Sequence, residues 1–431
     1  MTKIAHRAIS VLLIALLIVA GLTVYVMRWL DRGREWAGAF STVNSMSTGS
    51  LTDRDGRLLA SYDSAGVHYN SDYETRLACY HITGDFWNRS GTGALSTFWN
   101  ALQGYSWVTG TARGRTADLA LTVDSELCKL AYESLGGRKG AVLLSNYKTG
   151  EILALVSTPA VDPADADAVP QEGAYINRCL SATFTPGSVF KLLTAAAAIE
   201  SVPGMDTRSF LCEGKYVIAG VEIKCTGTHY EQNFEEALAN SCNSAFAQIA
   251  VKVGQNSMAE HARAYGFLDA HSLDGIPTAA GRYPTEFVGD PELAWSGIGQ
   301  STDLVNPYQM LRFVSAIANN GFLVEPHLLE TRVDGSGTQL MLASTAQRLA
   351  SMMSYNVFSH YGRENFPALN IAAKTGTAEL GDGTTHAWFV GFLADESHPY
   401  AFVVLVERGG GGLVNAGPIA NTILQAAVRD A

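Results

Sequence analysis

The chain has 431 residues, of which 47% are hydrophobic and 16% are charged, and its formal net charge at pH 7 is −11. This length exceeds what one small hydrophobic core supports, so we expect two folded units. The negative charge argues against nucleic acid and against an anionic membrane surface as binding partners.

The first predicted element is a membrane-spanning helix, because the segment from Ala8 to Met27 is predominantly apolar and carries no charge. At about 1.5 Å per residue, a helix of this length crosses a hydrocarbon core of about 30 Å. Secretory signals have shorter apolar regions followed by a small-residue cleavage site. This segment instead continues to Trp29, so we predict an uncleaved anchor within residues 1–30, with a cleaved signal as the alternative. Basic residues lie on both sides of it, and their distribution leaves the orientation open.

Residues 31–117 give the weakest signals, and we predict a short non-catalytic region with little core of its own. The segment Gly49–Arg57 indicates a short strand followed by a turn at Asp55-Gly56, where glycine readily supplies a positive φ. One or two short helices are predicted in the segments that contain Trp87, Trp99 and Leu102.

From Asp118 the pattern becomes that of an α+β domain, which we predict to cover residues 118–431. A strand is expected at Leu119–Val123. One sheet is expected from five further apolar segments: Ala141–Ser145, Glu151–Ser157, Ile371–Thr377, Ala387–Phe392 and Phe402–Glu407. The first two and the last two should form hairpins, which makes the sheet mainly antiparallel. Helices covering both of its faces are predicted at Ser125–Leu135, Leu192–Glu200, Phe234–Ala239, Ser244–Val253, Tyr308–Ala318 and Pro418–Val428.

The chemistry is concentrated in three motifs: Ser188-Val189-Phe190-Lys191, Ser241-Cys242-Asn243 and Lys374-Thr375-Gly376-Thr377. A serine hydroxyl is a weak nucleophile and needs a base within hydrogen-bonding distance. Residues i and i+3 share a helix face. Ser188 and Lys191 therefore meet if a helix begins at about Pro186, with Thr185 as its N-cap.

Five residues of these motifs are the predicted catalytic set: Ser188, Lys191, Ser241, Asn243 and Lys374. Lys191 acts as a base only when it is neutral, and we expect burial and the nearby Lys374 to lower its pKa from about 10.4. Ser241 is expected to pass a proton between this amine and the leaving group. Asn243 is expected to hold the substrate amide and to orient Lys191.

The third motif is the predicted substrate-binding strand. Lys374 should attract a substrate carboxylate, Thr375 and Thr377 should supply hydroxyls, and Gly376 should let the strand approach the substrate closely. The backbone N–H groups of Ser188 and Thr377 are the expected oxyanion hole, each donor being worth about 3–4 kcal/mol in comparable enzymes.

Second copies of two motifs occur earlier in the chain. Ser145-Asn146-Tyr147-Lys148 and Lys148-Thr149-Gly150 overlap at the predicted turn of the first hairpin. No helix can bring Ser145 and Lys148 together there, so we interpret both copies as a solvated turn.

The cysteines give no sign of a metal centre. Cys79, Cys128, Cys179, Cys212, Cys225 and Cys242 show no Cys-x-x-Cys spacing, and no His-Glu-x-x-His motif occurs. We therefore predict no metal and no cofactor. Cys212 and Cys225 flank a predicted hairpin at Gly214–Ile223 and could form a disulfide outside the cell, with free buried thiols as the alternative. Cys242 is interpreted as a small buried filler and His229 as a loop or surface histidine.

With these three motifs in this order, the chain resembles a class B penicillin-binding protein, one of the membrane-anchored peptidoglycan transpeptidases of bacteria. The similarity runs from about Gly49 to the C-terminus and is dense from Asp118. It also rests on Leu51–Gly56, Leu121–Asp124, Thr149–Ala154, Pro186–Lys191 and His386–Phe392. The resemblance implies the penicillin-binding fold, α+β with a five-stranded sheet. It also implies that the D-Ala-D-Ala end of a stem peptide acylates Ser188 and releases D-Ala, after which a neighbouring stem's amine takes the acyl group. β-Lactam antibiotics would acylate the same serine.

The resemblance further implies a single-pass protein of the bacterial cell membrane with an extracytoplasmic catalytic domain. Residues 31–117 are too few for a glycosyltransferase domain, so a separate membrane glycosyltransferase is the expected partner. They are also few for this family, which implies reduced docking to partners. Gly299-Gln300-Ser301 replaces a Gly-Gln-Gly pattern of the family, so we expect an altered loop there.

Two alternatives remain open. The first is a hydrolase on the same fold, either a β-lactamase or a D,D-carboxypeptidase. A class A β-lactamase needs a glutamate in a Glu-x-x-Leu-Asn loop, and Leu369-Asn370 occurs without a glutamate at that spacing. The second alternative is a non-enzymatic penicillin sensor or scaffold. It is disfavoured because all three motifs are intact and few residues precede the anchor.

Overall fold

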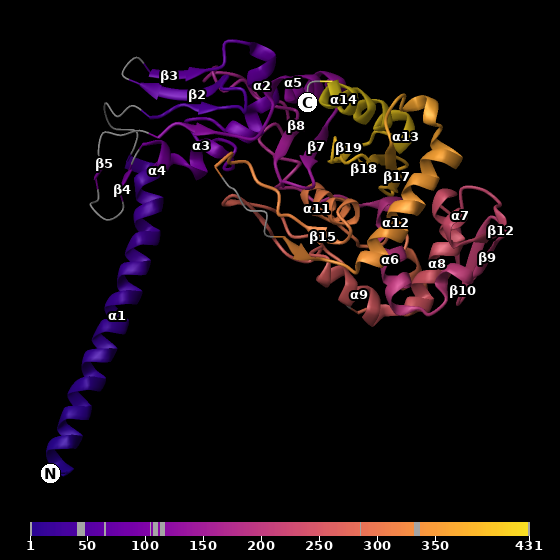
Figure 1. The fold of residues 1–431 in the computed structure, drawn as a ribbon, viewed down its shortest axis with the longest axis horizontal. Helices are drawn as coiled ribbons and strands as arrows, with labels where there is room; N and C mark the ends of the chain where they lie inside the picture. The colour runs from indigo at the N-terminus through magenta and orange to yellow at the C-terminus, as the bar shows by residue number, and fades with distance from the viewer. Residues whose placement is uncertain are drawn as a thin grey trace.

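The computed structural model describes residues 2–40, 48–63, 66–103, 105–106, 111–112, 117–284, 286–331 and 337–429. A long N-terminal helix, α1 (Thr2–Phe40), extends away from an α+β body (Figure 1). Its segment His6–Leu30 has a mean hydropathy of 2.8 and no buried residues, and it is long enough to cross a membrane. The part of the chain that the structure describes contains one such helix, which fits the predicted anchor.

The body is built on the predicted five-stranded sheet. Its strand order is β17 (Ile371–Glu379), β18 (Thr385–Leu393), β19 (Tyr400–Val406), β7 (Gly140–Asn146) and β8 (Ile152–Thr158). All four neighbouring pairs are antiparallel, so the expectation of a mainly antiparallel sheet is confirmed. Strands β8 and β19 are buried at every position, which explains the continuous apolar runs Ile152–Val156 and Tyr400–Val406. The strand that carries the third motif, β17, lies at one edge.

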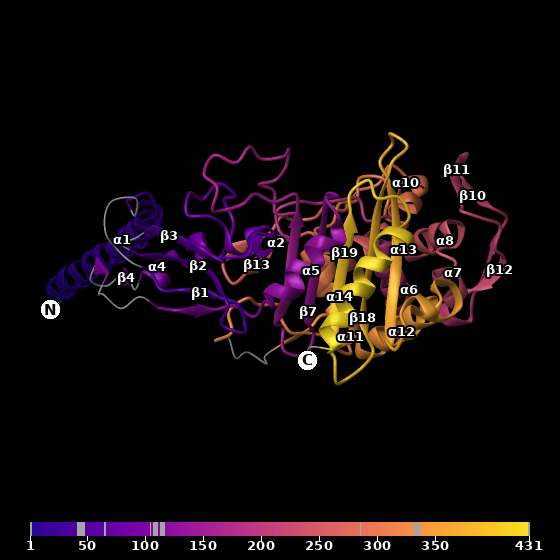
Figure 2. The same cartoon turned by 90° about the horizontal axis from the view of Figure 1, so that it is seen from above.

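Helices cover both faces of this sheet, as predicted. α5 (Ser125–Leu135) and α14 (Gly417–Arg429) lie on one face and α11 (Pro307–Ala318) on the other (Figures 1 and 2). The remaining helices of the body are α6 (Lys191–Ser201), α7 (Phe234–Ala239), α8 (Asn243–Val253), α9 (Gln255–Ala264), α10 (Asp290–Ser296), α12 (Ala343–Asn356), α13 (Gly412–Asn415) and the short turns Gly187–Phe190, Met205–Thr207, Val357–Tyr361 and Arg363–Asn365. Two-stranded ribbons are formed by β9 (Ser209–Cys212) with β12 (Tyr230–Asn233), β10 (Lys215–Ile218) with β11 (Val221–Lys224), β13 (Ser272–Leu273) with β14 (Ile276–Pro277), β15 (Phe322–Leu323) with β16 (Thr338–Gln339), and β4 (Tyr105–Ser106) with β5 (Thr111–Ala112).

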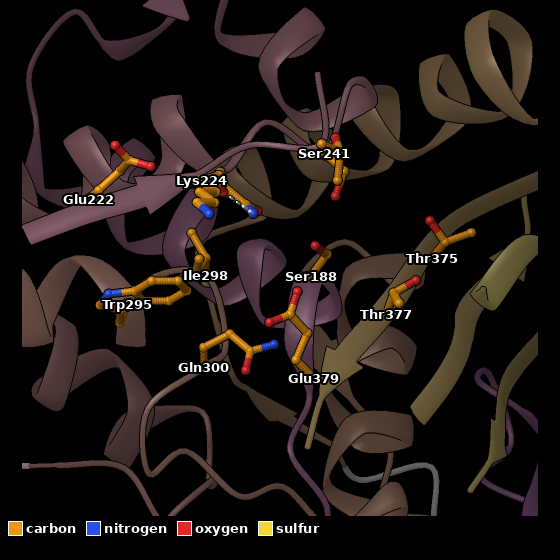
Figure 3. Close-up of a pocket in the computed structure, with 12 residues that line it drawn as sticks. Ser188, Glu222, Lys224, Ser241, Trp295, Ile298, Gln300, Thr375, Thr377 and Glu379 are labelled. Carbon is orange, nitrogen blue, oxygen red and sulfur yellow. Dashed lines mark hydrogen bonds between the residues drawn. The ribbon is translucent and has the colours of Figure 1, made fainter. Parts of the chain in front are cut away.

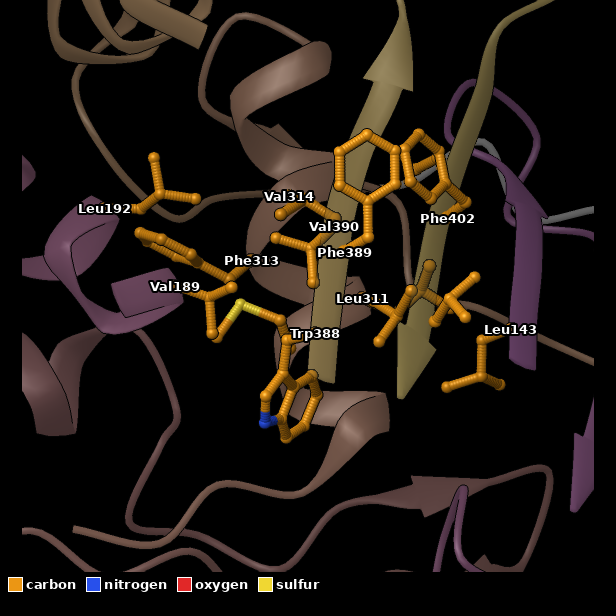
Figure 4. Packing of buried hydrophobic residues seen from close by; sticks show 14 of the residues in the cluster. Leu143, Val189, Leu192, Leu311, Phe313, Val314, Trp388, Phe389, Val390 and Phe402 are labelled. Atoms are coloured by element: carbon orange, nitrogen blue, oxygen red, sulfur yellow. The ribbon is translucent and has the colours of Figure 1, made fainter. Parts of the chain in front are cut away.

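The hydrophobic core connects the sheet to the segment that carries the first motif. Trp388 and Phe389 of β18 lie in one cluster of buried residues with side chains of α11, and Val189 belongs to the same cluster (Figure 4). All three are fully buried. Burial of a side chain of this size stabilises the fold by about 1.5–3 kcal/mol. Because Val189 directly follows Ser188, the core fixes the position of the predicted nucleophile.

The region between α1 and the body has more structure than the sequence indicates. A second sheet has the order β3 (Gly66–Tyr69), β2 (Leu58–Asp63), β1 (Leu51–Thr52) and β6 (Leu119–Ala120). The predicted strand and the turn at Asp55-Gly56 are confirmed, with Gly56 at φ +78°. The predicted short helices are present as α3 (Ala94–Thr97) and α4 (Trp99–Leu102), whereas Trp87 lies in a turn.

Helix α2 (Tyr73–Thr83) was not predicted from the sequence; it begins at an Asp72 cap and packs on α5 and β8. Buried residues of this region, such as Leu59 and Ala78, belong to the same cluster as the core of the body. The region therefore has little core of its own, as predicted, and packs on the α+β body. The predicted strand at Leu119–Val123 is shorter in the structure. Only Leu119–Ala120 form a strand, β6, and it pairs with β1 of the N-terminal sheet.

Candidate active site

Ser188 lies on a tight turn, and the predicted helix start is wrong in detail. Residues Gly187–Phe190 form a 3₁₀ turn after Pro186, and α6 begins only at Lys191. Thr185 does not cap this helix; its carbonyl accepts a hydrogen bond from Trp388 Nε1 at 3.0 Å. Gly187 has φ +55°, and a Cβ atom there would lie 2.7 Å from the carbonyl oxygen of Thr377. The turn is therefore pressed against β17 at a position that only glycine fits.

Lys191 is fully buried and contacts Ser188, Ser241 and Asn243, as expected. Its Nζ atom lies 3.1 Å from Ser188 Oγ, 2.7 Å from Asn243 Oδ1, 2.5 Å from the Ser241 carbonyl oxygen and 3.3 Å from Ser241 Oγ. A neutral amine has two N–H groups and one lone pair. The two carbonyl-type oxygens take the N–H groups, which leaves the lone pair for a serine hydroxyl.

The protonation of this centre is set by burial. Burial lowers the pKa of Lys191 to about 8, while Cys242 and Cys225 act in the opposite direction. Burial, followed by the charge of Lys191, lowers the pKa of Lys374 well below its usual range. The expected effect of burial on Lys191 is thus present, whereas the repulsion between the two lysines acts on Lys374. A bound carboxylate would favour the charged form of Lys374.

Ser241 lies between the two lysines. Its Oγ atom is 3.3 Å from Lys191 Nζ and 3.0 Å from Lys374 Nζ. Its backbone has φ +50°, which is uncommon for a residue other than glycine. Asn243 is held in one orientation because its Nδ2 donates to the Lys224 carbonyl at 2.9 Å, so Oδ1 faces Lys191. These contacts form a continuous hydrogen-bonded path from Ser188 to Lys374.

Along β17, every second residue directs its backbone N–H and C=O groups toward the outer edge of the strand, away from β18. The N–H of Thr375 donates to Tyr361 Oη at 3.1 Å, and the Ala373 carbonyl accepts from Asn356 Nδ2 at 2.9 Å. Both groups therefore point away from β18. Since backbone direction repeats every second residue along a strand, the N–H of Thr377 points toward the same edge.

Gly376 differs from its expected role in substrate approach. A Cβ atom there would lie 3.0 Å from the Pro186 carbonyl oxygen and 3.0 Å from Val189 Cγ1. The space that its missing side chain leaves is used by the turn that carries Ser188, not by substrate.

A cleft of about 390 Å³ opens over these residues. Ser188 lies between Thr375 and Thr377 on one side and Trp295 and Gln300 on the other (Figure 3). The residues that line it are Ser188, Glu222, Lys224, Thr226, Ser241, Asn243, Trp295, Ile298, Gln300, Thr375, Thr377 and Glu379.

Comparison with known proteins identifies the family. The family model described as "Penicillin binding protein transpeptidase domain" matches residues 140–425. The chain belongs to this family. Penicillin-binding protein relatives include the peptidoglycan D,D-transpeptidase PbpA of Mycolicibacterium smegmatis, 28% identical over 369 residues and covering 73% of each chain. Stage V sporulation protein D of Bacillus subtilis is 28% identical over 343 residues, which cover 73% of this chain and 53% of the relative.

Solved structures agree with this assignment. The crystal structure of PBPA from Mycobacterium tuberculosis superposes with a TM-score of 0.77 at 25% identity, covering 89% of this chain and 100% of the other. Pseudomonas aeruginosa PBP2, solved in complex with WCK 5153, gives a TM-score of 0.76 at 26% identity, covering 89% and 96%. The resemblance to class B penicillin-binding proteins and the α+β transpeptidase fold are therefore confirmed.

The wall of the penicillin-binding cleft opposite β17 was missed from sequence. Trp295 and Ile298 come from α10 and the loop after it, and Glu222 comes from β11. The sequence feature that pointed to this wall was Gly299-Gln300-Ser301, which replaces the Gly-Gln-Gly pattern of the family and includes Gln300 of the cleft. Ser301 adopts φ +69°, the left-handed conformation that the glycine of the family pattern would take without strain.

The duplicate motifs are confirmed as a turn. Residues Tyr147–Thr149 connect β7 and β8, and Lys148 Nζ donates to Asn319 Oδ1 at 2.9 Å. Ser145 is buried in β7 and takes no part in the cleft.

The cysteines agree with one of the two alternatives left open by the sequence. All six are free thiols, so of the two alternatives for Cys212 and Cys225 the structure shows thiols. Four side chains lie together as the Cys/His cluster: Cys212, Cys225, His229 and Cys242, whose ligand atoms are all within 4.8 Å of one another. Cys242 is buried, as its interpretation as a filler requires, and His229 lies in the loop before β12, as predicted. The absence of a Cys-x-x-Cys spacing does not exclude such a cluster, because its four residues come from separate segments of the chain.

Proposed function

We propose that this chain is a peptidoglycan D,D-transpeptidase that works through an acyl-enzyme on Ser188. The observation that carries the proposal is the contact of Ser188 Oγ with Lys191 Nζ at 3.1 Å inside a cleft edged by β17. The family match and the relatives named D,D-transpeptidases support it.

In the first step, Ser188 Oγ attacks the carbonyl carbon of the penultimate D-Ala of a stem peptide. Its proton passes to the lone pair of Lys191, whose lowered pKa makes this possible near neutral pH. The C–N bond to the terminal D-Ala then breaks. Ser241 Oγ, which contacts both lysines, relays a proton to the leaving nitrogen. The products of this step are the acyl-enzyme ester and free D-Ala.

The developing oxyanion needs donors at the mouth of the cleft. We propose the backbone N–H groups of Ser188 and Thr377 for this role. The alternation along β17 supports Thr377, because its N–H shares the edge at which Thr375 N–H contacts Tyr361. Each such donor is worth about 3–4 kcal/mol of transition-state stabilisation in comparable enzymes. Lys374, Thr375 and the Thr377 hydroxyl are proposed to hold the terminal carboxylate.

In the second step, the amine of a neighbouring stem attacks the ester carbonyl and loses a proton to Lys191. The bond between the acyl carbon and Ser188 Oγ then breaks, and Lys191 returns the proton to Ser188. Glu222 and Glu379 line the cleft and favour the approach of a cationic amine. A β-lactam follows only the first step, because its leaving nitrogen stays attached to the acyl group within the opened ring. It therefore leaves a long-lived ester.

We further propose that α1 is an uncleaved anchor in the bacterial cell membrane, with the catalytic domain outside, where the stem peptides are. In this scheme residues 1–30 are the anchor, 31–117 a short pedestal and 118–431 the catalytic domain. Within the described ranges, the ordered parts are α1, the small N-terminal sheet with its helices, and the transpeptidase body. We also propose that a separate membrane glycosyltransferase is the partner that polymerises the glycan.

The test is covalent labelling of the full-length chain with penicillin, read by intact-mass spectrometry and peptide mapping. We expect one adduct per chain, located on Ser188. Ser188→Ala should abolish it, whereas the matched variant Ser145→Ala, in the duplicate motif, should retain it. Labelling that survives Ser188→Ala would overturn the assignment.

The same labelled protein separates the transferase from a hydrolase. A transpeptidase ester should persist for many minutes, whereas a β-lactamase would release opened penicillin within seconds. With a D-Ala-D-Ala stem peptide and an amine acceptor, the main product should be the cross-linked dimer. A product mixture that contains only the hydrolysed peptide at high acceptor concentration would favour a D,D-carboxypeptidase.

A further inference from the structure

The Cys/His cluster has the composition and placement of a metal site. Cys212 ends β9, Cys225 follows β11, His229 precedes β12 and Cys242 precedes α8. Cys212 and Cys242 are fully buried, and Cys225 and His229 are partly buried. Four soft or borderline ligands from separate segments therefore converge on one point, without a competing carboxylate among them.

Three of the six distances within the cluster match the edges of a tetrahedron around zinc, and all six are within 4.8 Å. Zn–S bonds of about 2.3 Å and a Zn–N bond of about 2.05 Å place two sulfurs about 3.8 Å apart and a sulfur and a nitrogen about 3.5 Å apart. The Cys225 and Cys242 sulfurs are 3.8 Å apart, and His229 Nδ1 lies 3.5 Å from both Cys212 Sγ and Cys225 Sγ. All three separations agree with a four-coordinate ion at the centre.

Backbone donors around the cluster suit thiolate ligands. The N–H of Asn243 lies 3.3 Å from Cys225 Sγ, and the N–H of Ala245 lies 3.4 Å from Cys242 Sγ. Both donors come from the first turn of α8, whose N-terminal dipole favours negative charge. Such outer hydrogen bonds orient ligands and favour a thiolate at a metal site.

We propose that Cys212, Cys225, His229 and Cys242 bind one Zn²⁺ ion in a closed structural site. Thiolate and imidazole ligands select zinc over magnesium or calcium, and four protein ligands leave no open position for a substrate. Binding releases the thiol protons to solvent and forms three Zn–S bonds and one Zn–N bond. The ion ties the β9–β12 and β10–β11 ribbons to the start of α8.

The position of the ion also affects the cleft, and this part of the inference rests on the proposed function. Cys242 lies between Ser241 and Asn243, and Cys225 follows Lys224, whose carbonyl holds the Asn243 amide. Asn243 therefore follows one proposed ligand, Cys242, directly in the chain. The carbonyl group that holds its side-chain amide belongs to Lys224, which directly precedes another ligand, Cys225. The ion would hold Ser241 in its left-handed conformation and Asn243 Oδ1 against Lys191, so these ligands act as positioning residues.

The test begins with the metal content of the full-length chain, purified in detergent without a polyhistidine tag. Elemental mass spectrometry should find about one zinc per wild-type chain. Cys212→Ser and His229→Ala should lower this at least about fivefold. Cys179→Ser is the matched control, because Cys179 is also buried but lies outside the cluster, and it should retain the metal.

A second measurement avoids variants that fold poorly. In the wild-type chain, Cys212, Cys225 and Cys242 should resist alkylation until a zinc chelator is added, and cobalt exchange should give thiolate-to-metal absorption. A wild-type chain without stoichiometric zinc, a mapped Cys225–Cys242 disulfide, or full zinc retention by Cys212→Ser would each overturn the proposal.

A third measurement separates this proposal from the function of the cleft. Ser188→Ala should keep its zinc while losing penicillin labelling, so failure of the acyl-enzyme mechanism would leave the metal result intact. In the chain with an intact Ser188, zinc removal should slow labelling by about 10-fold or more, and re-addition of zinc should restore it. An unchanged labelling rate after complete zinc removal would contradict the positioning role.

Discussion

The pH dependence of acylation tests the base assigned to Lys191. Burial lowers the pKa of this amine to about 8, and only the neutral amine accepts the Ser188 proton. Its neutral fraction is about 1% at pH 6, about half at pH 8 and about 90% at pH 9, so the acylation rate should rise roughly 90-fold over this range. The rise should level off above about pH 9, whereas a lysine with the ordinary pKa of 10.5 would still gain about eightfold between pH 9 and pH 10.

The assay is stopped-flow acylation by a fluorescent penicillin, whose carboxylate stays charged over the whole range. Saturation kinetics separate the acylation rate constant from the dissociation constant. This matters because the lowered pKa of Lys374 should weaken binding of the carboxylate at high pH. Lys191→Ala should give a slow rate without the midpoint near pH 8. A plateau already reached at pH 6.5, or a rate that still rises about fivefold or more between pH 9 and pH 10, would refute the assignment.

Three further predictions concern the supports of the cleft. Gly187→Ala should lower the free energy of unfolding by roughly 2–4 kcal/mol, because φ is positive there and a backbone carbonyl oxygen lies 2.7 Å from the new Cβ. The control Gly137→Ala, with φ +76° and open space around the new Cβ, should lower it by only about 1 kcal/mol. Equal losses for the two variants in a denaturant titration would contradict the packing argument. Tyr361→Phe removes the partner of the Thr375 N–H and should cost about 1–3 kcal/mol with slower acylation; a wild-type penicillin-labelling rate would argue against this support of β17. Asp303 is buried, which raises the pKa of its carboxyl well above the usual range, so the neutral Asp303→Asn should shift stability by less than about 1 kcal/mol; a loss of several kcal/mol on thermal unfolding would mean that the carboxylate is charged.

Local sequence determined much of the catalytic domain. Helices α5 and α7 have the bounds that their apolar periodicity predicted, and the five strands of the sheet lie within a few residues of the apolar segments. The duplicate Ser145–Gly150 motifs were separable from the functional ones because a hairpin turn and a helix have different local signatures. These features depend on residues close in sequence, where propensity and periodicity act.

Only the tertiary structure decided which distant segments meet. The start of α6 moved to Lys191 because Gly187 packs against β17, and β17 is nearly two hundred positions further along the chain. The cleft wall with Trp295 and the Cys/His cluster likewise come from segments that share no local pattern. Such contacts depend on how the core closes around the sheet, because long-range packing selects among conformations that local propensity leaves nearly equal.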